Sequence, residues 1–308
     1  MSKKPPFTGA GIAITTPFKE DLSIDYELFE KHIDFLIKNK ADAIVVAGTT
    51  GESATLSFNE KMELTRVAKE RVKSRAKIIA GAGSNNTAEV LKLSNEYEKI
   101  GVDTLMIVTP YYNKASQKGL INHYTEIANK VNTQIMLYNV PSRTGLNMSA
   151  NTISKLAKHE NISCIKEASG DFTQIAEIAE KTFSVDNFHI YAGNDDQILA
   201  MKALGAVGAV TVAGNIIPEV IHNLFTIPNE ESNLNNSNVK NNFSDNYYLD
   251  LQLSILEFVR AIFSEVSPAP IKAALTELEL STNYLRPPMY EMENKEVVIN
   301  AMKNLGVL

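Results

Sequence analysis

The sequence has almost no cysteine and no long apolar run, and both absences narrow the class of protein. Cys164 is the single cysteine in 308 residues, so no intramolecular disulfide can form. This usage is typical of a reducing compartment. No run reaches the roughly 18 apolar residues of a membrane span, and no apolar stretch follows the N-terminal lysines as it would in a signal peptide. We therefore expect a cytoplasmic protein that does not enter a membrane.

Clustered positive charge and metal-binding spacing are also lacking. The formal net charge is −6, and lysine and arginine form no basic stripe of the kind that nucleic acid binds. The five histidines are dispersed, without HxH or HExxH spacing, and no Ser-His-Asp elbow occurs. We expect neither a nucleic-acid partner nor a bound metal.

Short apolar runs alternate with longer amphipathic ones along the chain. Helical patterns lie between the apolar runs, for example at Phe58–Lys73 and at Thr87–Ile100, where Asn86 and Glu89 predict a capping box. Eight such units in about 225 residues favour an α/β fold, a (β/α)8 TIM barrel. A doubly wound sheet is the alternative, but its glycine fingerprints are missing. The predicted strands are Gly11–Thr15, Ala43–Ala47, Lys77–Ala80, Thr104–Val108, Gln134–Tyr138, Ser163–Lys166, His189–Ala192 and Gly208–Val212.

Residues 229–246 interrupt this alternation. Eight of these eighteen residues are asparagine, and so polar a tract cannot bury enough apolar surface to order itself. We predict a barrel catalytic domain at 1–228, a connector at 229–246 and a small C-terminal helical domain at 247–308. The helices expected in the last domain span 247–263, 268–280 and 295–305.

A lysine at the end of an apolar strand is the first candidate for chemistry. A period of two places Ile162, Cys164 and Lys166 on one face of the strand. If that face lines the barrel, the amine lies at a strand's carboxyl end, where barrel enzymes perform catalysis. Burial favours the neutral amine, which can form an imine with a carbonyl. The alternative is a lysine that extends to solvent and pairs with a carboxylate.

Other polar groups follow the predicted strands. The turn at 48–53, GTTGES, offers hydroxyls and backbone N–H groups for a carboxylate, or is an ordinary loop. Tyr138 is expected to point inward and move protons, and Arg143 to clamp a carboxylate; the alternatives are a core tyrosine and a surface arginine. The aromatics of PYYN at 110–113 indicate a subunit contact or local packing. Asp195 and Asp196 precede a predicted helix at Gln197–Leu204 and are expected to cap it.

Five motifs together resemble the dihydrodipicolinate synthase family in order, spacing and strand-end placement: GTTGES at 48–53, PYYN at 110–113, YNVPSRTG at 138–145, IKEASGD at 165–171 and AGND at 192–195. The resemblance runs from about Phe7 to Leu308, interrupted by the Asn-rich tract. It implies a lyase that condenses pyruvate with L-aspartate 4-semialdehyde through a lysine Schiff base, in lysine (diaminopimelate) biosynthesis. It further implies no cofactor and a homotetramer built from two tight dimers.

The resemblance also implies roles for single residues. Lys166 is then the imine nucleophile. Tyr138, Thr49 and Tyr112 form a proton relay, with Tyr112 reaching in from the neighbouring subunit. Thr50, together with the Thr49 amide, holds the pyruvate carboxylate.

Further substrate contacts follow from the same resemblance. Arg143 is expected to bind the carboxylate of aspartate semialdehyde, and Gly193 and Val210 to contribute backbone groups. N-acetylneuraminate lyases of the wider superfamily lack an arginine at this position. The alternatives are such a pyruvate-dependent aldolase, or a catalytically silent paralogue that acts as a binding protein.

A regulatory site for L-lysine is the last implication, and here the chain departs from the family. Ser53, Ala54, Asn85, Glu89 and Tyr111 resemble its frame. Phe58 stands at a position of this site that is often histidine in the family. Lys61 stands at a second position, which is often histidine or glutamate. Like charges about 4 Å apart repel by about 1 kcal/mol in water and about 4 kcal/mol at a partly shielded surface. We expect weak or absent feedback inhibition, unless the Lys61 side chain turns into solvent.

Overall fold

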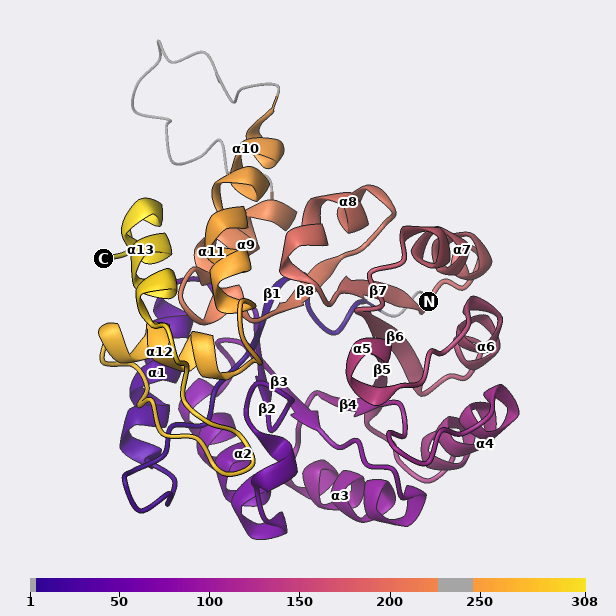
Figure 1. The fold of residues 1–308 in the computed structure, drawn as a ribbon. Coiled ribbons are helices and arrows are strands. Elements are labelled where there is room, and N and C mark those ends of the chain that lie inside the picture. Colours follow the sequence, from indigo (N-terminus) through magenta and orange to yellow (C-terminus); the bar gives the residue numbers. More distant parts are fainter. Residues whose placement is uncertain (1–3, 227–245) are drawn as a thin grey trace.

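The structure is a computed structural model and describes residues 4–226 and 246–308. Eight parallel strands close into a barrel in sequence order, with helices around the outside (Figure 1). The predicted (β/α)8 barrel is therefore confirmed. The strands are β1 Gly9–Ala13, β2 Ala43–Val46, β3 Lys77–Gly81, β4 Thr104–Val108, β5 Gln134–Asn139, β6 Ile162–Glu167, β7 His189–Ala192 and β8 Gly208–Thr211.

The first strand begins earlier in the chain than predicted. Gly9 and Ala10 pair with Gly208 and Ala209 of β8 and so close the barrel. Glycine and alanine carry little hydrophobic signal, and the prediction therefore placed the start of the strand at Gly11. The other seven predicted strands lie within one residue of the observed bounds.

Helices cover the outer surface of the barrel. Helix α2 begins with a capping box, in which Ser57 and Glu60 each accept the other's backbone N–H. The capping box predicted for α3 is wrong in its second half: Asn86 caps Ala88, but the Ser84 hydroxyl accepts the Asn86 N–H in place of Glu89. The outer helices are α1 Tyr26–Lys38, α2 Phe58–Val72, α3 Thr87–Ile100, α4 Gln117–Ala128, α6 Ala150–Leu156, α7 Phe172–Thr182, α8 Ile198–Ala203 and α9 Pro218–Phe225.

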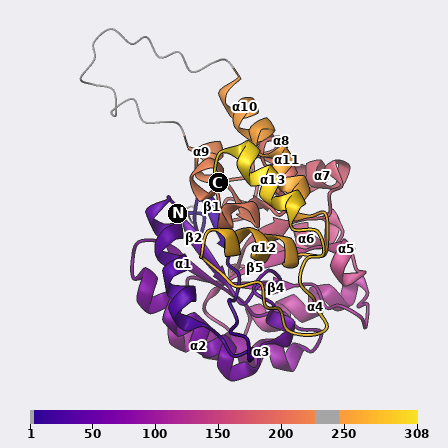
Figure 2. The same ribbon diagram turned by 60° about the vertical axis from the view of Figure 1, so that its left-hand side comes forward.

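The C-terminal helices gather on one side of the barrel (Figures 1 and 2). Helix α10 packs on α8 and α9, while α11 and α12 pack on the short turn 213–215 after β8. These helices are α10 Tyr247–Ser254, α11 Leu256–Ile262, α12 Ala269–Glu277 and α13 Glu296–Leu305. The helix predicted at 247–263 is thus divided at Ile255. Of the predicted connector, 229–245 lie outside the described residues.

Two apolar layers form the core. One fills the barrel, and the other lies between the strands and the helices. At the amino-terminal end the Phe7 ring lies 4.5 Å from the Tyr191 ring, and the Tyr191 hydroxyl donates to the Phe7 carbonyl at 2.6 Å. A side chain at Gly11 would collide with the Phe7 ring. This end of the barrel is closed.

Strand β6 contains a register shift that the alternation pattern did not predict. Ile162 pairs with Ile135, but the next pair along β5 is Met136 with Cys164, which leaves Ser163 as an extra residue. Ile162 therefore faces the helices, whereas Cys164 belongs to the inner layer. The expectation that Ile162 shares a face with Cys164 and Lys166 was wrong, because a bulge changes the facing of every residue on one side of it.

Among the described residues, none of the helices has both the length and the apolar content that crossing a bilayer requires.

Candidate active site

Lys166 lies near the end of β6 and is 5% exposed. Its register partner on β5 is Tyr138, and the lysine Nζ lies 4.4 Å from the centre of the tyrosine ring. Tyr138 is equally buried and belongs to the inner layer. The barrel therefore holds an amine and a phenol side by side at its carboxyl end.

A cavity of about 200 Å³ opens at this end of the barrel. It brings together six of the eight residues predicted to be catalytic or substrate-binding: Thr49, Thr50, Tyr138, Arg143, Lys166 and Gly193. Val210 lies instead in the inner layer on β8, and Tyr112 projects into solvent.

The loop 48–53 shapes one wall of this cavity. Thr50 is 4% exposed and Thr49 is exposed. The turn closes on itself, because the Glu52 N–H donates to the Thr49 carbonyl at 3.1 Å. The Thr16 hydroxyl donates to the Gly51 carbonyl at 2.8 Å. The loop that carries the two threonines is therefore fixed at Thr49 and at Gly51.

The short helix α5 (Pro141–Thr144) carries Arg143, which also lines the cavity. The arginine side chain is exposed. The guanidinium is therefore open to solvent on the lining of the same cavity as Lys166.

Tyr112 lies in the loop after β4 and is 90% exposed. The loop is braced, because Asn113 donates to the Asn85 carbonyl at 2.9 Å and Asn85 donates to the Tyr111 carbonyl at 3.2 Å. Tyr112 itself has a backbone φ of 72°, in the left-handed region. Packing within this chain does not explain why an aromatic ring stands at this exposed position.

Only some of the residues predicted for the regulatory site line one cavity. An adjoining cavity of about 350 Å³ is lined by Ser53, Ala54, Lys61 and Tyr111, together with Thr49, Tyr138 and Arg143 of the first cavity. Burial lowers the pKa of Lys61, and the charge of Glu89 opposes this shift.

Phe58, Asn85 and Glu89 are not among the residues that line this second cavity. The Phe58 ring lies under Lys92, with 4.6 Å from Nζ to the ring centre. Glu89 accepts from the Ser84 hydroxyl at 3.3 Å. Lys61 is therefore the lysine of this predicted site that lines the second cavity, while Lys92 contacts the Phe58 ring outside that lining.

Behind Lys166 and Tyr138 lies a buried polar pair that the sequence analysis missed. Asn139 donates to Glu167 at 3.0 Å, and the Ser169 N–H donates to the same carboxylate at 2.7 Å. Burial raises the pKa of Glu167. Polar residues at outward-facing positions of buried parallel strands are unusual, and this was the signal that could have identified both.

Asp195 does not cap a helix as predicted. Its carboxylate accepts the N–H groups of Val212 at 3.0 Å and Ala213 at 2.8 Å. Burial raises its pKa, against the influence of hydrogen bonds and of the Lys166 charge. The side chain turns inward because its backbone forms a tight turn at 195–197, and it fastens the end of β8 beside the cavity.

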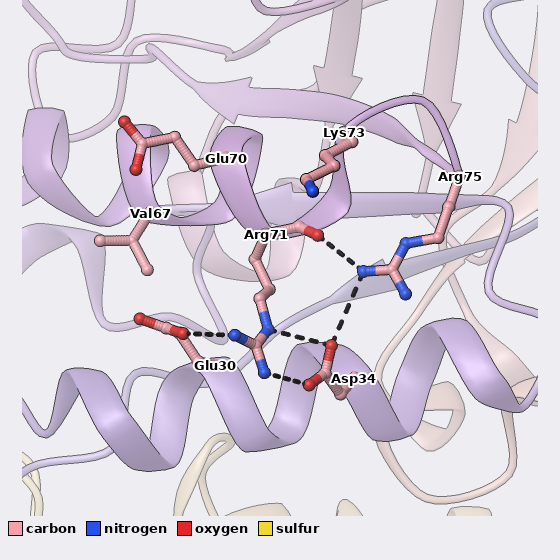
Figure 3. A pocket seen from close by; sticks show the side chains of 7 residues that line it. All are labelled: Glu30, Asp34, Val67, Glu70, Arg71, Lys73 and Arg75. Carbon is pink, nitrogen blue, oxygen red and sulfur yellow. Dashed lines mark hydrogen bonds and ion pairs between the residues drawn. The ribbon is translucent and has the colours of Figure 1, made fainter.

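A further hollow of about 570 Å³ lies between α1 and α2 (Figure 3). Its charges bind one another: Arg71 donates to Glu30 at 2.9 Å and to Asp34 at 3.0 Å. It lies on the outer helices and contains none of the predicted site residues. Within the described ranges, no group of three or more His, Cys, Asp or Glu side chains is placed to hold a metal ion.

A closed parallel barrel with a buried amine in a strand-end cavity defines the chain as a (β/α)8-barrel enzyme. The model of the Dihydrodipicolinate synthetase family matches residues 6–303. The chain belongs to this family.

Individual relatives agree with this assignment. The 4-hydroxy-tetrahydrodipicolinate synthase of Brachyspira hyodysenteriae is 43% identical over 303 residues, covering 98% of each chain. The dihydrodipicolinate synthase structure from Thermotoga maritima superposes with a TM-score of 0.90 at 34% identity, covering 99% of this chain and 100% of that one. The lysine-bound enzyme from Cyanidioschyzon merolae gives 0.89 at 36% identity, with the same coverage.

Proposed function

We propose that this protein is a lyase with 4-hydroxy-tetrahydrodipicolinate synthase activity. It condenses pyruvate with L-aspartate 4-semialdehyde in lysine (diaminopimelate) biosynthesis. The observation that carries the proposal is Lys166, buried in the wall of the strand-end cavity with Tyr138 beside it.

The first stage of the reaction is imine formation. The Lys166 amine attacks the keto carbon of pyruvate, and the resulting carbinolamine loses water to give the imine. The Tyr138 ring lies 4.4 Å from the amine, and we assign to its hydroxyl the proton transfers of both steps, with Thr49 and the partner subunit's Tyr112 completing the relay to solvent. Thr50 and the Thr49 amide hold the pyruvate carboxylate, and backbone groups of Gly193 and Val210 complete the pocket.

The second stage forms the carbon–carbon bond. Removal of a proton from the pyruvate methyl group gives an enamine, whose carbon attacks the aldehyde of the semialdehyde. The amino group of the semialdehyde then attacks the imine carbon, closes the ring and releases Lys166. The imine serves as the electron sink, so the chemistry needs no cofactor, and Arg143 holds the carboxylate of the second substrate.

Two alternatives are distinguished by this site. A different pyruvate-dependent aldolase, such as N-acetylneuraminate lyase, would form the same imine but would not require an arginine at position 143. A silent paralogue would not need Lys166, Tyr138 and Thr49 in one cavity. We further propose a cytoplasmic homotetramer and the division into a barrel domain and a C-terminal helical domain.

The deciding experiment is reduction of the imine. Borohydride with pyruvate should inactivate the enzyme and add the reduced pyruvyl mass to Lys166. Lys77→Ala is the control variant and should still form the adduct on Lys166. Lys77 lies at the far end of its strand and pairs with Asp103 at 2.9 Å. Condensation with aspartate semialdehyde, coupled to the next reductase, and cleavage of N-acetylneuraminate should be assayed in parallel. Absence of an adduct on Lys166 would refute the proposal.

A further inference from the structure

A buried ion pair joins the C-terminal helices to the loop that carries Thr49 and Thr50. The side chains of Lys272, on α12, and Glu52, in the loop, are 0% and 1% exposed, and their charged atoms lie 2.7 Å apart. The lysine also donates to the Thr16 carbonyl at 3.0 Å and to the Tyr284 carbonyl. All three protons of the ammonium are therefore used.

Glu52 is held equally firmly on its other side. Its second carboxylate oxygen accepts the Arg286 N–H at 3.1 Å. Its backbone has a φ of 55°, in the left-handed region, which is costly for a residue other than glycine. The loop therefore keeps this conformation because its surroundings impose it.

The contacts of Lys272 converge on the substrate loop from two directions. Glu52 follows Thr49, Thr50 and Gly51 directly, and its N–H donates to the Thr49 carbonyl. Thr16, whose carbonyl accepts from Lys272, donates its hydroxyl to Gly51. One ammonium thus fixes the loop after β1 and the loop after β2 relative to each other.

Energetics argue against a purely stabilising role. Burying two charges costs several kcal/mol per ion, and replacing such pairs by apolar residues is often neutral or stabilising. Burial lowers the pKa of Lys272, and Glu52 opposes the shift. A pair that adds little net stability but holds four backbone segments together is suited to setting geometry.

We propose that Lys272, through Glu52 and Thr16, is a positioning residue that sets Thr49 and Thr50 for binding the substrate carboxylate. The inference rests on the proposed function, because it takes the loop 48–53 as the carboxylate site. Lys272 itself touches no substrate and lies behind the loop.

The test compares three variants. Lys272→Met keeps the side-chain stem and removes the ammonium, and Glu52→Gln/Lys272→Met removes both charges and so avoids an unpaired buried carboxylate. Lys202→Met is the matched control, since Lys202 also sits on a helix and donates to a backbone carbonyl, that of Leu224, at 2.7 Å. Thermal stability, the KM for each substrate and the rate of borohydride trapping at saturating pyruvate are measured for each.

Both Lys272 variants should raise the KM for pyruvate by about tenfold or more, with the trapping rate at saturation within about threefold of the unchanged enzyme. The KM for aspartate semialdehyde and the kinetics of Lys202→Met should be close to unchanged. If the double variant recovers both thermal stability and the KM for pyruvate, the pair is merely structural and the inference is overturned. A KM for pyruvate within twofold in either folded variant overturns it as well.

Failure of the proposed function has a different signature. In that case the unchanged enzyme forms no adduct with pyruvate on Lys166, whatever residue occupies position 272.

Discussion

At the scale of single residues, Arg143 separates the proposed reaction from those of related aldolases. Its exposed guanidinium lies on α5 at the wall of the Lys166 cavity. Hydrogen bonds to a charged group contribute about 1.5–3 kcal/mol, which is about 10- to 150-fold in kcat/KM at about 1.4 kcal/mol per tenfold. Arg143→Ala should lose this much with aspartate semialdehyde, while borohydride trapping of pyruvate changes little.

Arg143→Lys is the informative companion variant. It keeps the positive charge but not the planar fork, and should recover part of the loss. Semialdehyde kinetics that stay at the original level in Arg143→Ala would remove the arginine from the site.

Lys61 determines the expected response to L-lysine. It lines the second cavity and brings a positive charge to its wall. A cationic ligand is repelled there, so half-inhibition should require more than about 0.1 mM L-lysine, near −5.5 kcal/mol of binding. Lys61→Glu should strengthen inhibition by about tenfold or more, measured as the rate at fixed pyruvate over a range of L-lysine concentrations.

The pH dependence gives an independent check on Lys61. Because its pKa is lowered, it loses its positive charge sooner than an ordinary lysine as pH rises. Inhibition by L-lysine should therefore strengthen with increasing pH in the unchanged enzyme. Inhibition below about 0.1 mM at neutral pH would contradict the repulsion argument.

At the scale of helices and strands, the hydrophobic alternation predicted what depends on local pattern. The strands of a parallel barrel are apolar on both faces, and every strand after the first stood out as an apolar run that ends at turn residues. What the pattern missed depends on neighbours. The start of β1 is set by pairing with Gly208, the bulge at Ser163 by register against β5, and the partner of Asn86 by Ser84.

The candidate site was likewise predictable where it depends on local sequence pattern, and not where it depends on contacts between distant segments. Lys166 and Tyr138 could be placed because strand ends meet at one edge of a barrel. Glu52 and Lys272 could not, because 220 residues separate them and no local pattern joins the two. Asp195 was assigned to the wrong partner, since its carboxylate binds a segment 17 residues further along.

Helix α2 is tied to the C-terminal segment by Glu60 and Arg286, and this tie should be sensitive to acid. Arg286 donates to the Glu60 carboxylate at 2.9 Å, and this contact lowers the pKa of Glu60 to about 2. A lowered carboxyl pKa contributes stability above the unfolded value of about 4.3 that is lost as pH falls toward about 2.

The measurement is the urea midpoint of Glu60→Gln and of the unchanged protein at pH 7, 4.5 and 3. We expect the variant to be less stable by about 1.5–3 kcal/mol at pH 7, with a difference that shrinks on acidification. Glu63→Gln is the control, because Glu63 lies one turn along the same helix and pairs with Arg66 in a more exposed contact. A difference that stays constant between pH 7 and pH 3 would exclude Glu60 as its source.

At the scale of the whole molecule, the proposed assembly makes activity depend on two subunits. Tyr112 is 90% exposed and does not line the Lys166 cavity of its own chain. If the ring completes a neighbour's site, Lys166→Ala and Tyr112→Phe should complement each other. A mixed dimer contains one intact site, so equal mixing with exchange should restore about a quarter of the original activity.

The controls are the two variants alone, which should each show little activity, and a mixture whose subunits cannot exchange. Analytical ultracentrifugation of the same samples follows assembly. If the mixture is no more active than either variant alone, the proposed role of Tyr112 in the neighbouring subunit's proton relay is wrong. The dependence of activity on the dimer is then wrong as well.

The Phe7–Tyr191 contact has a kinetic consequence. Because it closes the amino-terminal end of the barrel, every molecule that reaches Lys166 must arrive and depart through the strand-end mouth. Pyruvate, the water lost on imine formation, the semialdehyde and the product therefore share one route. The deepest position has to be filled first and is vacated last, so the enzyme should follow an ordered ping-pong scheme in which pyruvate always precedes the semialdehyde.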